Sequence, residues 1–147
     1  MKIALGCDHA GYELSESVEN HLVTLGHEVT RFGALSEERF DYPLASDGVA
    51  CAILDGSQEL GVLICGSGIG VSIRANRYDG IRAALCHSTE TAELARQHNH
   101  ANVLCLGARI LSKDLALAIL ESFLNTEVDS GERHVKRVEL LDGNKPC

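Results

Sequence analysis

The stretch that decides the fold is Leu60–Arg77, LGVLICGSGIGVSIRANR. Its first six residues, LGVLIC, form an apolar run of the kind found in a strand that is covered on both faces of a parallel sheet. A glycine-rich turn, GSGIG, follows directly, and GVSIRANR then has the pattern of a helix. The strand is therefore expected to end on Cys65, beside a turn whose backbone N–H groups can face an anion.

The same alternation of strand and helix patterns continues along the chain in both directions. Upstream, for example, Leu14, Val18 and Leu22 recur at helical spacing between two short strand-like segments. Alternation of this kind, without repeats or linkers, predicts a single α/β domain over residues 1–147 with a mainly parallel sheet. The expected strands are 2–8, 27–33, 60–65, 80–86 and 102–110, and the expected helices are 12–26, 44–54, 70–77, 88–98 and 112–125.

Composition excludes several classes of protein. A formal net charge of -8 argues against nucleic-acid and anionic-membrane partners, although a local basic cluster could still bind a small phosphate. No apolar run approaches the roughly 20 residues of a membrane helix, and the N-terminus turns polar too early for a signal peptide. The cysteines form no C-x-x-C pair, so we expect reduced thiols in a cytoplasmic protein. They are Cys7, Cys51, Cys65, Cys86, Cys105 and Cys147.

Polar residues follow four of the predicted strands at their carboxyl ends. Ligands of parallel α/β sheets bind at this edge, so the sequence predicts a pocket there. The four strand ends are Cys7-Asp8-His9, Cys65-Gly66-Ser67, Cys86-His87-Ser88 and Gly107-Ala108-Arg109.

The glycine turn and its cysteine each allow a structural and a functional interpretation. GSGIG is neither a dinucleotide-binding G-x-G-x-x-G nor a P-loop, so a tight turn and an anion cradle fit it equally. Most cysteines are buried and inert. However, Cys65 leads into a helix N-terminus, an environment that favours a thiolate. Cys7 also ends a strand and is the main alternative for a reactive thiol.

The histidines near the strand ends suggest proton transfer more than metal binding. His9, His98 and His100, with Asp8 and a thiol, include the ligand types of zinc. No two of them share the usual ligand spacing, and residues two positions apart diverge on a regular element. A general acid–base histidine is therefore the preferred interpretation.

A basic segment, GERHVKRVEL, stands near the end of this acidic chain. Arg133 and Arg137 are four residues apart and would share one face if the segment is helical. Two guanidinium groups so placed can clamp a phosphate. A solvated basic patch is the alternative.

Six motifs, in this order, resemble those of the type B ribose-5-phosphate isomerases and related sugar-phosphate isomerases, among them the galactose-6-phosphate isomerase subunits. The resemblance runs from Lys2 to about Val138, and the set is far more specific than any single motif. The motifs are GCDHAG, DYP, ICGSGIGVSIRANR, GIRAAL, RQHNHANVLCLGAR and GERHVKRV.

The resemblance implies an aldose–ketose isomerase of the pentose phosphate pathway, which interconverts ribose 5-phosphate and ribulose 5-phosphate through a cis-enediolate. It implies no metal or other cofactor, and a Rossmann-like three-layer α/β/α sandwich. It also implies a homodimer, or a dimer of dimers, with active sites at the subunit interface. By the same resemblance, Cys65 is the base, and His98 assists opening of the sugar ring with Asn99 beside it. The groups implied to steady the enediolate oxygen are Ser67, Gly66, Gly68 and Gly70.

The resemblance implies substrate contacts as well. Asp8 matches a contact to a sugar hydroxyl, and Arg109 matches a basic position that could approach the phosphate from the partner subunit. The matches to phosphate contacts are His9, Arg133 and Arg137.

Three departures from the family pattern keep alternatives open. Ser67 replaces a more frequent threonine and keeps the hydroxyl, and His100 stands where an acidic or small polar residue is common. Glu132 replaces a glycine beside the arginine pair, so four-carbon sugar phosphates and allose 6-phosphate remain possible substrates. Retention of His98 argues against the galactose-6-phosphate branch. From other classes, a non-catalytic sugar-phosphate or nucleotide binding domain and a zinc-dependent hydrolase also remain.

Overall fold

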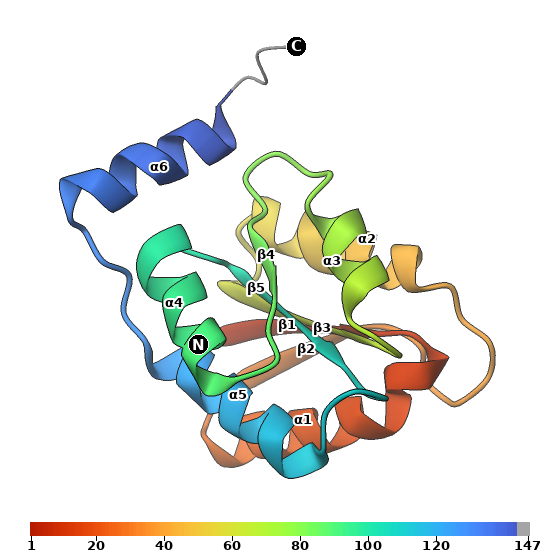
Figure 1. Cartoon of the computed structure of the whole chain (residues 1–147). Coiled ribbons are helices and arrows are strands. Elements are labelled where there is room, and N and C mark those ends of the chain that lie inside the picture. The colour runs from red at the N-terminus through yellow and green to blue at the C-terminus, as the bar shows by residue number, and fades with distance from the viewer. Residues whose placement is uncertain (144–147) are drawn as a thin grey trace.

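Five parallel strands form one sheet in the order β2-β1-β3-β5-β4 (Figure 1). The computed structural model describes residues 1–143, and Cys147, expected to be a reduced thiol, lies outside them. The expected α/β fold with a parallel five-stranded sheet is confirmed. The strands are β1 (Lys2–Cys7), β2 (Glu28–Gly33), β3 (Leu60–Cys65), β4 (Ala83–Leu85) and β5 (Val103–Gly107).

Helices cover both faces of the sheet, which gives three layers. Helices α1, α4 and α5 pack on one face and α2 and α3 on the other, while α6 lies outside α4 (Figure 1). A 3-10 turn, η1 (His9–Gly11), connects β1 to α1. The helices are α1 (Tyr12–Thr24), α2 (Tyr42–Leu54), α3 (Ile69–Ala75), α4 (Thr89–Asn99), α5 (Lys113–Asn125) and α6 (Glu132–Asp142).

The apolar run LGVLIC forms β3, and every one of its residues is buried. Val62 and Ile64 belong to the core on the α1/α5 side, whereas Leu63 and Cys65 belong to the core on the α2/α3 side. This alternation follows from the two-residue period of a strand. The continuous apolar pattern is thus explained, because both faces of β3 need apolar side chains.

The chain changes direction across the sheet between β1 and β3. From β1 it passes through α1 to the edge strand β2, and from β3 it passes through α3 to β4 at the opposite edge. At such a point the connections diverge and leave a crevice outside the carboxyl ends of the strands. The residues that follow Cys7 and Cys65 therefore border the same crevice.

Several elements differ in extent from the prediction; β5, for example, was expected over 102–110 and spans Val103–Gly107. Helix α2 begins at Tyr42, two residues early, because Pro43 fits the first turn of a helix. Strand β4 is shorter than 80–86. The side-chain amide of Asn76 accepts the N–H of Ala83 and donates to its carbonyl oxygen, both at 2.8 Å, and so takes the place of a further strand. The basic segment is helical, as the prediction for the arginine pair required.

Two further observations concern the described residues. Among them, no helix combines the length and the apolar character that crossing a bilayer requires. The cysteines at positions 7, 51, 65, 86 and 105 are all free thiols.

A polar cluster joins α3, the helix that follows the glycine turn, to α2. The carboxylate of Asp47 accepts hydrogen bonds from Arg74 Nε at 2.6 Å and from the Tyr78 hydroxyl at 2.8 Å. These two hydrogen bonds, that from Arg74 first, lower the pKa of Asp47. The cluster fixes the position of α3 on α2, and with it the position of the turn.

Replacement of Asp47 by Asn should weaken this link. Both side chains of the ion pair are partly exposed, so we expect the free energy of unfolding at pH 7 to fall by only about 0.5–1 kcal/mol. Because the folded-state pKa of Asp47 is depressed, its contribution is full above the unfolded-state pKa of about 3.9 and is lost as the pH falls through the folded-state value. Urea denaturation from neutral to acid pH, with Asp79→Asn as an exposed control, checks this. A difference independent of pH would contradict the assignment.

Candidate active site

A cavity of about 330 Å³ lies at the carboxyl ends of β1 and β3, at the crevice that the topology predicts. It is bordered by the ends of β1, β3 and β5 with the residues that follow them, and by the first turn of α2. Its lining residues are His9, Ala10, Tyr42, Cys65, Gly66, Ser67, Gly70, Arg109 and Ile110.

The thiol of Cys65 is held at the floor of this cavity by the glycine turn. Cys65 is only 4% exposed, and its Sγ accepts the backbone N–H of Gly68 at 3.1 Å. Gly68 has a φ of 76°, and a Cβ there would lie 2.5 Å from the Leu85 side chain and 2.9 Å from the Leu106 carbonyl carbon. Only glycine fits this position. The turn thus aims a peptide dipole at the sulfur.

The other buried cysteines have structural surroundings. Cys7, the alternative reactive thiol, is fully buried and donates a hydrogen bond to Ser15 Oγ at 3.3 Å. Burial raises the pKa of Cys86 and raises that of Cys105 well above its usual value, so both thiols stay protonated. None of the three lines the cavity, and among residues 1–143 Cys65 is the thiol that does.

The glycine turn also presents the Ser67 hydroxyl to the cavity, and the ring of Tyr42, from α2, packs against the turn. Ser67 Oγ accepts the N–H of Ile69 at 3.3 Å, which leaves its own hydrogen free to donate. The ring of Tyr42 packs on Gly70, where a Cβ would lie 2.7 Å from the ring atoms. The sequence analysis missed Tyr42 as a site residue, and its only signal was the DYP motif.

The residues after β1 and β5 complete this half of the site. Asp8 is buried, and its Oδ1 accepts the N–H of Gly11 at 2.9 Å, so it caps the 3-10 turn beside the cavity instead of lining it. His9 lines the cavity, and its Nδ1 lies 3.1 Å from the carbonyl oxygen of Phe40. Arg109 borders the cavity of its own chain, although the resemblance suggested an approach from a partner.

The other predicted site residues gather at a second place, where α4 meets α6. His98 and Asn99 form the last turn of α4, and Arg133 and Arg137 lie on α6. The rings of His98 and His134 are stacked, with centroids 4.3 Å apart and 7° between the planes. Sequence reasoning did not select His134, which stands between the two arginines in the GERHVKRV motif.

The two clusters lie at opposite ends of the strands. Cys65 pairs with Gly107 at the carboxyl end of β5, whereas His98 precedes Val103, which begins β5 and pairs with Gly61. Gly107 stands four positions after Val103 along the strand, a distance of about 13 Å. Because α4 runs back across the sheet before β5 begins, its last turn cannot reach the thiol of the same chain.

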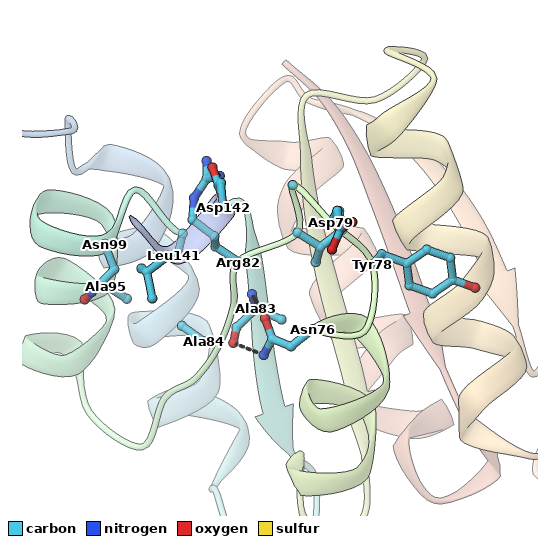
Figure 2. Close-up of a pocket in the computed structure, with 13 residues that line it drawn as sticks. Asn76, Tyr78, Asp79, Arg82, Ala83, Ala84, Ala95, Asn99, Leu141 and Asp142 are labelled. Atoms are coloured by element: carbon cyan, nitrogen blue, oxygen red, sulfur yellow. Dashed lines mark hydrogen bonds and ion pairs between the residues drawn. The ribbon is translucent and has the colours of Figure 1, made fainter. Parts of the chain in front are cut away.

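A groove of about 430 Å³ adjoins the second cluster (Figure 2). In Figure 2, Ala95 and Asn99 of α4 and Leu141 of α6 lie on one side, across β4 from Asn76 and Asp79. This groove is larger than the cavity at Cys65, but it contains neither thiol nor glycine turn. Its position places open space directly beside Asn99.

The histidines do not form a metal site in the described residues. Within positions 1–143, no three histidine, cysteine or carboxylate side chains are close enough to hold an ion. His100 Nε2 lies 2.9 Å from the backbone oxygen of Asp129, on the loop before α6, so this ring has a structural partner.

Comparisons with known proteins identify the family of the chain. Residues 3–141 match the model of the Ribose/Galactose Isomerase family. Ribose-5-phosphate isomerase B of Escherichia coli is 45% identical over 140 residues, which cover 95% of this chain and 93% of the relative. The crystal structure of a ribose 5-phosphate isomerase from Thermotoga maritima has a TM-score of 0.93 and 48% identity, over 96% of this chain and 97% of that one. A ribose-5-phosphate isomerase B of Clostridium thermocellum has a TM-score of 0.94 and 43% identity, over 97% and 95% of the two chains. The chain therefore belongs to the Ribose/Galactose Isomerase family.

Proposed function

We propose that this protein interconverts ribose 5-phosphate and ribulose 5-phosphate, with Cys65 as the base. The observation that carries the proposal is the placement of a thiol, a hydroxyl and a glycine turn around one cavity at the crevice of the sheet. The names of the E. coli and T. maritima relatives indicate the same substrate. The free thiols of the described residues also fit the cytoplasmic location that we expect.

The reaction needs a base that moves one proton between neighbouring carbons. The Cys65 thiolate takes the proton from C2 of the open aldose, and the electron pair left behind forms the C1–C2 double bond of a cis-enediolate. Transfer of the O2 hydroxyl proton to O1, together with return of the proton to C1, gives the ketose with its carbonyl at C2. The Ser67 hydroxyl and the amides of Gly66 and Gly70 stabilise the charge that develops on the oxygen, while the amide of Gly68, also implied by the resemblance, donates to the Cys65 sulfur. Positioned donors of this kind and a positioned base each contribute about 10²–10⁴-fold to a rate.

The phosphate holds the substrate away from the reacting carbons, so that its binding energy orients them. His9 and Arg109 supply cationic or hydrogen-bonding groups at the Cys65 cavity, and Arg133 and Arg137 supply two guanidinium groups at the second cluster. Asp8 remains a proposed contact for a sugar hydroxyl, beside its capping hydrogen bond.

A complete site requires two copies of the chain. General acid–base groups act over hydrogen-bond distances of about 3 Å, and the two clusters of one chain are separated by most of a strand. We therefore propose a homodimer in which the Cys65 cluster of one copy faces the His98 cluster of its partner. His98 then assists ring opening, and Asn99 contacts the sugar.

Glu132 does not by itself indicate a different substrate. It occupies the first turn of α6, where the helix dipole stabilises an acidic side chain. A structural role at the helix N-terminus therefore accounts for this departure from the family pattern. Ribose 5-phosphate remains the preferred substrate over four-carbon sugar phosphates and allose 6-phosphate.

Substitution Cys65→Ala tests the base. Loss of the thiol should lower kcat by about 10²–10⁴-fold while the substrate still binds, since the phosphate contacts remain. Proton NMR of ribose 5-phosphate turnover in the presence of a chelator measures the rate. Cys51→Ala, which removes an exposed thiol from α2, serves as the control and should keep wild-type activity.

Three outcomes separate the alternatives in this experiment. Turnover by Cys65→Ala at the wild-type rate would rule out the thiol as base. Saturable binding by the wild type without any product would indicate a binding domain. Activity that disappears with chelator and returns with zinc would indicate metal chemistry.

Dilution tests the need for two copies. If each site contains residues of both chains, turnover per chain should fall in step with the fraction of dimer. Sedimentation velocity with fluorescence detection measures the dimer fraction at the concentrations used in the assay. A monomeric population with full turnover would contradict the composite site.

A further inference from the structure

His134 contacts both the ring of His98 and the guanidinium group of Arg133 in the second cluster. It is 2% exposed and lies on α6 between Arg133 and the ring of His98 on α4. The stack with His98 is nearly parallel, at 7° and 4.3 Å between centroids. Figure 1 shows α6 beyond the last turn of α4, and the buried ring of His134 contacts that turn at His98.

The hydrogen bond from Arg133 shows which nitrogen of the His134 ring carries the proton. Arg133 Nε lies 3.0 Å from His134 Nε2. A guanidinium N–H can only donate, so Nε2 must accept with its lone pair. A neutral His134 therefore carries its proton on Nδ1, which is buried and has no hydrogen-bond partner within residues 1–143.

The surrounding charges favour this neutral form. Burial, the neighbouring His98, and the positive charges of Arg133 and Arg137 lower the pKa of His134. The carboxylate of Asp129 acts in the opposite direction, but its Oδ2 lies 3.5 Å from Nε2, which is long for a hydrogen bond. The net shift is downward, so the ring stays neutral under conditions in which a free histidine becomes charged.

We propose that His134 is a positioning residue that acts through two separate contacts: its ring face orients His98 for ring opening, and its Nε2 orients Arg133 for the phosphate. This inference rests on the proposed isomerase function. It adds that the phosphate clamp and the ring-opening histidine are held by one side chain. The proton-transfer group and the anchor then keep a fixed geometry, which proximity catalysis requires.

The two contacts can be removed one at a time. His134→Phe keeps a flat ring against His98 but has no acceptor for Arg133. We expect KM to rise several-fold, with kcat within about twofold of wild type, because ground-state and transition-state binding of the phosphate weaken together. His134→Gln keeps an oxygen that can accept from Arg133 but offers no ring to stack. We expect kcat to fall by about 10-fold or more with KM near wild type, because His98 loses its orientation.

Steady-state kinetics of the two variants, with melting temperatures, gives the first test. Opposite patterns in kcat and KM support the proposal. Equal changes in both constants, with an equal loss of melting temperature, would show that His134 only holds the helices together, and would overturn it.

Nitrogen-15 NMR gives a test that does not depend on turnover. The wild-type spectrum should show His134 with Nδ1 protonated and Nε2 unprotonated at neutral pH. The Arg133 Nε–H signal should shift in His134→Phe, and the His98 ring signals should shift in His134→Gln. A protonated Nε2, or variants that shift neither partner, would overturn the proposal even in a protein that turns over ribose 5-phosphate. Absence of turnover in the wild type would instead count against the isomerase function.

Discussion

The direction of the helix between β4 and β5 is the constraint on which the site depends. In a parallel sheet every connecting helix must run back to the edge where the next strand begins. A residue at the end of a strand therefore lies at the carboxyl ends of the strands, and a residue at the end of a connecting helix lies near their amino ends. Cys65 ends β3, and His98 stands in the last turn of α4. The proposed site of two copies follows from this separation, because the two clusters of one chain lie at opposite ends of the strands.

Specific contacts hold each of the two clusters in place. At the Cys65 cavity, the N–H of Gly68 contacts the sulfur in a turn that only glycine can adopt. The Asp47 cluster then fixes the helix that follows. At the other edge, the buried ring of His134 spaces α4 from α6. Both clusters carry cationic or hydrogen-bonding side chains, His9 and Arg109 at the cavity and Arg133 and Arg137 on α6, in a chain of net charge -8.

The sequence allowed the sheet, the glycine turn and the Cys65 position to be predicted, because they depend on local patterns. An apolar run indicates a strand that is covered on both faces of the sheet. A glycine-rich turn directly after such a strand indicates a binding crevice at the carboxyl end of the sheet. Tyr42 and His134 were not selected, because their importance arises from contacts with residues far away in sequence. Tyr42 meets the glycine turn across the crevice, and His134 stacks on a ring 36 positions earlier. The strand β4 was predicted, but over 80–86 instead of Ala83–Leu85.

We propose that every active site combines Cys65 of one copy with His98 of another. A heterodimer of Cys65→Ala and His98→Asn chains, purified with two different tags, tests it most directly. If the sites are shared, one of the two sites receives both intact residues, and the heterodimer should recover about half of the wild-type turnover while each parent homodimer stays impaired. If Cys65 and His98 act within one chain, both sites of the heterodimer carry a substitution. Turnover no higher than the mean of the two parents would contradict the account.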